Sequence, residues 1–256
     1  MGRRFDPDRA HQLTWRGEGG FVRTLWKLMP IKFRNLTHFV FHRINSSRIL
    51  LRLFSFRHSL TVGTLRNQNR PINLRIGESR FFSGWLSTNY QVFARHYLDA
   101  TKDYGNEFCK YIFADNVIEH LDRDKGHLLL QRAFTALQPG GVIRIATPDL
   151  GQIATKYVNR DFVALRDFQK DLSNHQLSIQ DFPDLLRVTF TAFGHHKGFI
   201  YDRETLDALL EKVGFVRVKH HQPGESDRLE LRDLESRTGS SDLWSQMAVE
   251  AEKPLN

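Results

Sequence analysis

Histidines offer the chemistry most easily inferred from this sequence. His120 directly follows Glu119 and comes about a turn and a half of chain after an apolar stretch at 109–114. Histidine titrates near neutral pH, so an imidazole placed after a strand is suited to take the proton of a hydroxyl group as a general base. The alternative is that Glu119 and His120 only begin a helix and pack or cap there. His120 is therefore a candidate catalytic residue.

A second pair of histidines, His195 and His196, lies in a Gly-His-His-Lys-Gly segment. Polar, glycine-flanked loops often carry binding residues, so this segment is predicted to contact a substrate, with His196 as the second candidate catalytic residue. A metal site would need a third ligand at a suitable spacing, and the sequence shows none beside the pair. No metal is therefore expected.

The composition is that of an ordinary globular protein. The 256 residues are 40% hydrophobic and 26% charged, enough for one sizeable core. The single cysteine, Cys109, has no partner for an internal disulfide. No apolar run reaches the roughly 18–20 residues of a membrane span, and Met-Gly-Arg-Arg at the start lacks the apolar region of a signal peptide. A cytoplasmic protein is therefore expected.

The net charge of +8 is unevenly distributed along the chain. Residues 1–70 contain 14 Lys and Arg against 3 Asp and Glu, whereas the remainder holds 23 against 26. A basic extension on a nearly neutral body predicts contact with something anionic: a membrane surface, a nucleic acid or a phosphorylated substrate.

Apolar residues recur at helical spacing between positions 21 and 56, which predicts two or three short helices in this extension. Pro30 separates the first from the second, and Asn45-Ser46-Ser47 is typical of a cap before the third. Basic amphipathic helices that carry Trp and Phe can lie in a bilayer interface, so residues 21–58 are a candidate surface for the inner membrane face. Alternatively, their apolar faces pack on the main domain and the arginines face water.

After residue 70 the pattern changes to alternating strands and helices. Strands are expected at 72–74, 84–89, 96–99, 109–114 and 142–146, with a helix at 125–137 that a Pro139-Gly140-Gly141 turn stops. A helix from 150 to about 170, an irregular insert to 191, a helix at 203–213 closed by Gly214, and an antiparallel pair at 215–221 and 243–252 complete the series. This order predicts a Rossmann-like α/β fold with a mainly parallel seven-stranded sheet and helices on both faces. The predicted domain spans 71–256 and follows a helical extension, 1–70.

Several spaced motifs also carry a resemblance. They are Asn73-Leu74-Arg75-Ile76-Gly77, Gly84-Trp85-Leu86, the segments 97–102, 111–121 and 137–145, Thr147-Pro148-Asp149-Leu150, and a C-terminal set of His196-Lys197, Tyr201-Asp202 and Gly214-Phe215. In their order and spacing over residues 70–253 they resemble class I S-adenosylmethionine-dependent methyltransferases, specifically a bacterial subgroup found with polysaccharide-biosynthesis enzymes.

The resemblance implies that S-adenosylmethionine lies across the carboxyl ends of the first strands. Gly77 would form the turn through which the backbone approaches the cofactor. Asn89 stands where an acidic residue usually holds the ribose hydroxyls, and Asp99 and Ala100 would flank the adenine. Asp115 would lie on the side where the methyl group is presented.

Two positions depart from the family pattern. Arg75 replaces the first glycine of Leu-Gly-Cys-Gly, where a long cation either blocks the pocket or pairs with the cofactor carboxylate. Asn89, in place of an acid, weakens the ribose clamp. These changes are compatible with an active enzyme and with a scaffold that has lost or changed its cofactor.

The function predicted first is S-adenosylmethionine-dependent O-methylation of a saccharide or glycolipid intermediate, in which the saccharide comes from the resemblance. The competing prediction is a non-catalytic or repurposed binding or assembly module, which Arg75 and Asn89 favour. Nucleic acid is not the expected partner, because the segment 111–121 is not of the Asn-Pro-Pro-Tyr type and the extension is rich in apolar residues. The sequence does not predict an oligomeric state.

Overall fold

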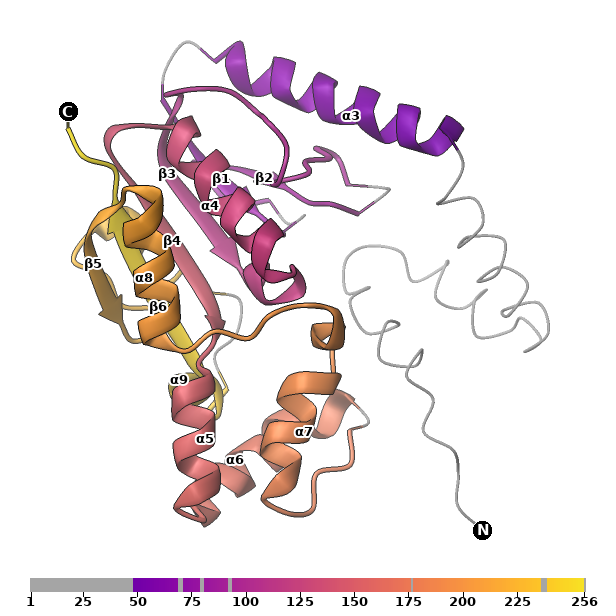
Figure 1. Ribbon diagram of the computed structural model, residues 1–256, viewed down its shortest axis with the longest axis vertical. Coiled ribbons are helices and arrows are strands. Elements are labelled where there is room, and N and C mark those ends of the chain that lie inside the picture. The colour runs from indigo at the N-terminus through magenta and orange to yellow at the C-terminus, as the bar shows by residue number, and fades with distance from the viewer. Residues whose placement is uncertain are drawn as a thin grey trace.

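The computed structural model describes residues 48–68, 71–78, 81–91, 94–175, 177–235 and 239–255. The helices expected between residues 21 and 40 and the Asn45-Ser46-Ser47 cap lie outside the described residues. The described part is built around a six-stranded sheet with helices packed beside it and a helical lobe at one end (Figure 1).

The strands are β1 (Ile72–Ile76), β2 (Trp85–Thr88), β3 (Cys109–Asp115), β4 (Leu137–Pro148), β5 (Val216–His221) and β6 (Gln246–Glu252). The α-helices are α3 (Arg48–Arg66), α4 (Arg123–Ala136), α5 (Leu150–Val158), α6 (Phe162–Leu172), α7 (Pro183–Thr191), α8 (Arg203–Val213) and the single turn α9 (Asp242–Ser245). Short 3₁₀ turns are η2 (Ile118–His120), η3 (Ser173–His175), η4 (His195–Lys197) and η5 (Leu229–Leu231).

The sheet has the order β2-β1-β3-β4-β6-β5. The first four strands run parallel, and β6 is antiparallel to both β4 and β5. This is the expected Rossmann-like α/β architecture with a closing antiparallel pair. Because β2 lies on one side of β1 and β3 on the other, the strand order reverses beside β1, which is where such sheets bind ligands.

The expected seventh strand, at 96–99, is missing from the described sheet. Tyr97 makes a single bridge to Asn89. Its backbone bonds to Asn89 alone of the β2 end: the Asn89 amide donates to His96 O and the Leu98 amide donates to Asn89 O, both at 3.1 Å. Contacts with α3 flank this bridge, since His58 Nδ1 accepts a hydrogen bond from the Asp99 amide at 3.3 Å and Arg57 donates to the Ala94 carbonyl. The segment therefore pairs beside the end of β2 through one residue, and its next amide is satisfied by α3 rather than by a longer ladder.

The two faces of the sheet are covered differently. On one face, α3, α4 and α8 contribute side chains to the main apolar core, and this includes Val62 and Leu65 of α3. On the other face, Leu231 and Leu234 of an irregular segment cover Phe113. The helix expected on this second face is therefore replaced, in the described chain, by a loop with one 3₁₀ turn. The last helix of the extension packs on the core.

Two local predictions were wrong in detail. The Pro139-Gly140-Gly141 segment lies inside β4, where the register to β3 shifts, rather than before the strand. Gly140 has a φ of +73° and donates its amide to Lys253 O at 2.9 Å, so the turn is a bulge in the ladder. The helix expected from 150 to 170 is two helices, because Arg160 has a φ of +50° and Asp161 caps α6.

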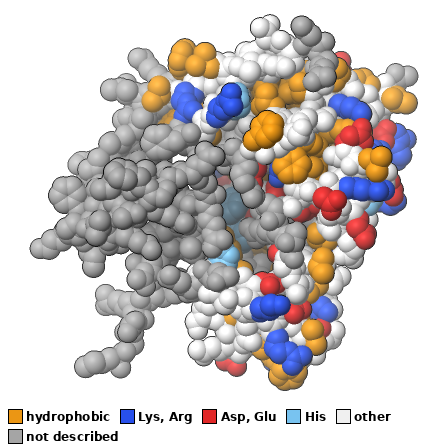
Figure 2. All heavy atoms as spheres, turned by 180° about the vertical axis from the view of Figure 1, so that it is seen from behind, with side chains coloured by type: hydrophobic (Ala, Val, Ile, Leu, Met, Phe, Trp, Pro, Cys, Tyr) orange, Lys and Arg blue, Asp and Glu red, His pale blue; other side chains and the backbone are white. Residues whose placement is uncertain are grey.

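The lobe formed by α5, α6 and α7 has its own apolar cluster. Of its three helices, α7 falls in the insert up to residue 191 that was expected to be irregular, and the lobe stands at the carboxyl end of β4 (Figure 1). None of the described helices is long and apolar enough to cross a bilayer. Acidic and basic side chains are interspersed over the described part of the face in Figure 2.

Candidate functional site

The carboxyl ends of β1 and β3 bring together several of the residues predicted to bind a cofactor. Gly77 directly follows β1 and has a φ of +93°. A Cβ atom at this position would lie 2.3 Å from Val117 Cγ2, so a residue larger than glycine does not fit without movement. The turn therefore has the tight, left-handed backbone expected of it, and it packs against the loop after β3.

Asn89 reaches the same turn from the end of β2. Its side-chain amide donates to Gly77 O at 3.0 Å, and its Oδ1 atom accepts from the Gln91 amide at 3.0 Å. The Gly77 amide donates in turn to Thr88 O at 2.9 Å. The structure thus brings together two residues that the sequence indicated as cofactor contacts, and their described polar groups bind one another or the adjacent backbone.

The side chain of Arg75 contacts groups of the protein itself. It lies in one register row with Phe113 of β3 and Arg144 of β4. It is 2% exposed, and its Nη2 atom donates to Leu234 O at 3.1 Å. The guanidinium also lies 4.5 Å from the centre of the Phe82 ring and 5.1 Å from that of Phe113. Arg75 thus holds the covering loop on the sheet.

Asp115 and Asp99 are both engaged with neighbouring groups. Asp115 Oδ2 lies 3.8 Å from Arg75 Nη2, and both side chains are buried. Asp99 Oδ1 accepts from the Thr101 hydroxyl at 2.7 Å, and its Oδ2 lies 3.6 Å from Lys102 Nζ. Ala100, the other predicted adenine contact, is buried beside them. Asp99 thereby stabilises the turn that contains it, whereas Asp115 pairs from β3 with Arg75 of β1.

Tyrosines near these elements remain protonated at neutral pH. Burial raises the pKa of Tyr97 above its usual range, and burial raises the pKa of Tyr201 to about 12. Neither phenol is therefore suited to take a proton from a substrate near pH 7.

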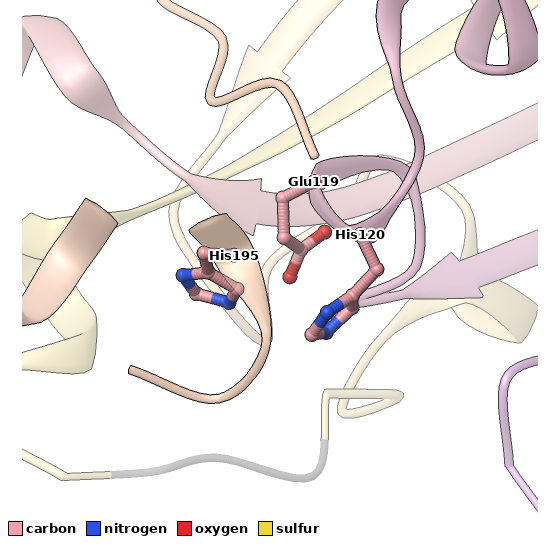
Figure 3. Close-up of side chains that lie close together, drawn as sticks. All are labelled: Glu119, His120 and His195. Atoms are coloured by element: carbon pink, nitrogen blue, oxygen red, sulfur yellow. The ribbon is translucent and has the colours of Figure 1, made fainter. Parts of the chain in front are cut away.

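The loop after β3 and the η4 turn bring three ligand-type side chains together. Glu119 is fully buried, His195 is 4% exposed, and His120 is an exposed residue. Figure 3 shows the Glu119 carboxylate pointing into the space between the two imidazole rings, whose centres are 4.9 Å apart. One nitrogen or oxygen atom from each residue lies within 4.8 Å of the other two.

Neighbouring groups orient two members of this cluster. Thr147 of β4 donates its hydroxyl to Glu119 Oε2 at 3.0 Å. His195 Nδ1 lies 2.7 Å from Thr189 O in α7. Because a carbonyl only accepts hydrogen bonds, Nδ1 of His195 carries the proton, and the Nε2 atom of the neutral ring carries the lone pair.

The two loops are in unusually close contact. A Cβ atom on Gly198 would lie 1.8 Å from Glu119 O, so only glycine allows the backbones to approach this far. Phe199 N also donates to Leu121 O at 2.9 Å. A cavity of about 40 Å³ adjoins His195 and Thr189, with room for a water molecule and none for a nucleoside.

Of the two histidines that the sequence indicated as catalytic candidates, the structure brings His120 into this cluster and leaves His196 outside it. His195 lies against His120, whereas His196 is exposed. The sequence did not indicate Glu119 as a third ligand-type residue, because Glu119 lies far from His195 along the chain. The usable signal was topological: the Glu119-His120 pair and the lobe that carries His195 both follow the carboxyl ends of parallel strands.

No protein-family model and no curated protein matches the sequence. Solved structures with a similar arrangement include a SAM-dependent methyltransferase of Archaeoglobus fulgidus, at 17% identity and a TM-score of 0.42, covering 81% of this chain and 100% of that one. A SAM-dependent methyltransferase of Thermotoga maritima is 13% identical at a TM-score of 0.42, over 82% of this chain and 95% of that one.

A phosphoethanolamine N-methyltransferase 2 of Haemonchus contortus, solved with S-adenosyl-L-methionine, is 14% identical at a TM-score of 0.38. The match covers 77% of this chain but only 52% of that one, so the chain spans about half the length of this neighbour. Similarities at this level do not establish a family for the chain.

Proposed function

We propose that the chain is an S-adenosylmethionine-dependent methyltransferase that acts on a hydroxyl group. The observation that carries the proposal is the meeting of Gly77, Asn89 and Asp115 where the strand order reverses, since open α/β sheets bind their ligands at this point. The identity of the cofactor comes from the resemblance of the spaced motifs to class I methyltransferases.

The residues at this edge fit such a cofactor in backbone shape. The left-handed turn at Gly77 allows close approach of a ligand, and Asn89 and Asp115 offer one amide donor and several acceptor oxygens. These three residues would hold the cofactor, which supplies an activated methyl group when bound. Asn89 would have to exchange its bond to Gly77 O for bonds to the ligand.

We assign removal of the proton from the acceptor hydroxyl to the cluster of Glu119, His120 and His195 after β3. His120 is its exposed member and suits proton transfer near neutral pH. The exposed His196, on the η4 turn, would contact the acceptor. A saccharide or glycolipid is proposed as the acceptor from the resemblance. We therefore expect His120→Gln to lower kcat and His196→Gln to raise KM with little change in kcat.

Titration calorimetry with S-adenosylhomocysteine tests the cofactor assignment. Wild type is expected to bind with one site per chain. Asn89→Asp is expected to bind several-fold more tightly, because it restores a carboxylate for the ribose hydroxyls. Asn159→Asp, the same change at the distant end of α5, serves as the matched control and leaves the affinity unchanged. No heat at high micromolar ligand would overturn the proposal.

A non-catalytic module is the second candidate, and the buried Arg75–Asp115 pair favours it. In this case Arg75 has become part of the core and the cofactor edge is filled by the protein's own contacts. The same titration separates the two: absence of binding by both wild type and Asn89→Asp is the result expected of the module.

The extension is proposed to hold the protein at anionic lipid. On α3, Leu53, Phe56 and Leu60 are spaced like one helical face and are 46%, 60% and 56% exposed. Wild type is expected to sediment with phosphatidylglycerol vesicles, and replacement of all three residues by serine is expected to reduce the bound fraction. Wild type that stays in the supernatant would contradict this proposal.

A further inference from the structure

The cluster of Glu119, His120 and His195 has the chemistry of a metal site. Two imidazoles and one carboxylate form a ligand set that catalytic zinc and non-haem iron sites use, with further positions left open. The three ligand atoms lie within 4.8 Å of one another. Around one ion with bonds of about 2.1 Å they would be roughly 3–3.5 Å apart, so a shift of about 1 Å is needed. His120 is exposed and can supply this movement.

The surroundings of the cluster match those of metal ligands. Metal-binding histidines typically donate their other ring N–H to a carbonyl or carboxylate, which fixes the tautomer. His195 does so, with Nδ1 at 2.7 Å from Thr189 O, so Nε2 is the ring atom that would ligate an ion. The Thr147 hydroxyl orients the Glu119 carboxylate in the same manner, at 3.0 Å.

The backbone holds the ligands before any ion arrives. The close approach of Gly198 to the Glu119 carbonyl and the bond from Phe199 N to Leu121 O fix η4 on the loop after β3. Two of the three ligands are buried and packed, so little conformational freedom is lost when an ion binds. Such rigidity is what a specific ion site needs.

We propose that Glu119, His120 and His195 bind one divalent transition-metal ion of the Zn²⁺ class. Two nitrogen donors select against Mg²⁺ and Ca²⁺, which prefer oxygen ligands. The exposed side of His120 leaves an open position for an acceptor or for water. His120 cannot ligate an ion and take a proton at the same time, so in the metal-bound form the ion would replace it in activating the acceptor.

The experiment uses the full chain without a histidine tag, stripped with a chelator and then titrated with Zn²⁺ by calorimetry and with Co²⁺ by visible absorption. Wild type is expected to take up one ion per chain and to give the d–d bands of a four- or five-coordinate Co²⁺ site. His120→Ala and Glu119→Gln are each expected to weaken binding at least 100-fold. His120 is exposed, so its variant is expected to fold, and circular dichroism checks both.

His196→Ala is the matched control, because it removes a neighbouring exposed histidine that lies outside the cluster. It is expected to bind like wild type. The proposal is overturned if wild type does not bind one ion per chain. It is also overturned if His120→Ala binds the ion as tightly as wild type, or if His196→Ala loses as much affinity as His120→Ala. The proposal does not rest on methyl transfer, and its failure leaves the titration with S-adenosylhomocysteine unaffected.

Discussion

Two regions at the same edge of the sheet differ in how their polar side chains are used. At the ends of β1 and β2, Asn89 binds the Gly77 carbonyl, and Arg75 binds the Leu234 carbonyl and pairs with Asp115. After β3, hydrogen bonds with Thr147 and Thr189 instead orient Glu119 and His195 toward a shared space. The comparison shows that closeness of polar residues does not by itself make a ligand site; the direction of the groups that orient them matters too.

The largest effect is expected from Arg75→Met in the first region. Breaking a buried ion pair leaves Asp115 without its cation and costs about 3–5 kcal/mol in the free energy of unfolding. Urea unfolding measures it. Arg217→Met, which removes an exposed partner of Glu252, is the control and is expected to cost less than about 1 kcal/mol. If the two variants lose the same free energy of unfolding, Arg75 does not stabilise the fold as a buried, paired cation.

Gly198→Ala tests how tightly the two loops of the second region are packed together. The added methyl group meets the backbone of Glu119, so the two loops must separate, at a cost of about 2–3 kcal/mol. The same change at Gly63 of α3 meets nothing within 4 Å and is expected to stabilise by about 0.5–1 kcal/mol. Thermal unfolding of both variants provides the measurement, and a neutral Gly198→Ala would show that the loops are not tightly docked.

Thr147→Val isolates the group that orients Glu119. The buried carboxylate loses a hydrogen bond, which is expected to destabilise the fold by about 1–3 kcal/mol. If the cluster binds Zn²⁺, its affinity should also fall about 10–100-fold. Thr135→Val, whose hydroxyl donates to Gln131 O within the exposed surface of α4, is the control for both readouts. Unchanged Zn²⁺ affinity in Thr147→Val would argue against this orienting role.

The smallest effect concerns pH. Burial lowers the pKa of His221, Arg144 adds to this, and Glu250 opposes it. The unfolded chain therefore binds a proton more readily than the folded chain, so stability falls as pH drops through the ordinary histidine value of about 6.5. His221→Gln should lose less stability than wild type between pH 7 and pH 5 in urea unfolding. Identical pH slopes would contradict this origin.

The sequence predicted helices and strands well where residues clearly alternate along a strand or cap a helix. Helix α8 begins and ends where Arg203 and Gly214 indicated, because a left-handed glycine ends a helix unambiguously. The strand predicted at 96–99 was wrong: the segment makes a single bridge to Asn89, and the next amide, that of Asp99, donates to His58, which lies 41 residues earlier. Such a long-range contact leaves no mark in a short window of sequence.

The candidate site was only partly predictable. The position of Gly77 followed from the turn that the chain must make after β1. The contacts of the Arg75 side chain could not be predicted, because a one-residue alternation in a strand decides which face it meets and the covering loop around Leu234 was not expected. The pairing of His120 with His195 depends on how η4 docks, which the sequence spacing does not express.

A crystal structure grown with saturating S-adenosylhomocysteine tests the proposed function most directly. We expect ligand density against the Gly77 turn, with the Asn89 amide released from Gly77 O and turned toward the ribose, while Arg75 keeps its bond to Leu234 O. If no ligand density is seen at the Gly77 turn and the Asn89–Gly77 bond is intact at saturating ligand, the proposed function is contradicted. That result would favour a module that does not use this cofactor.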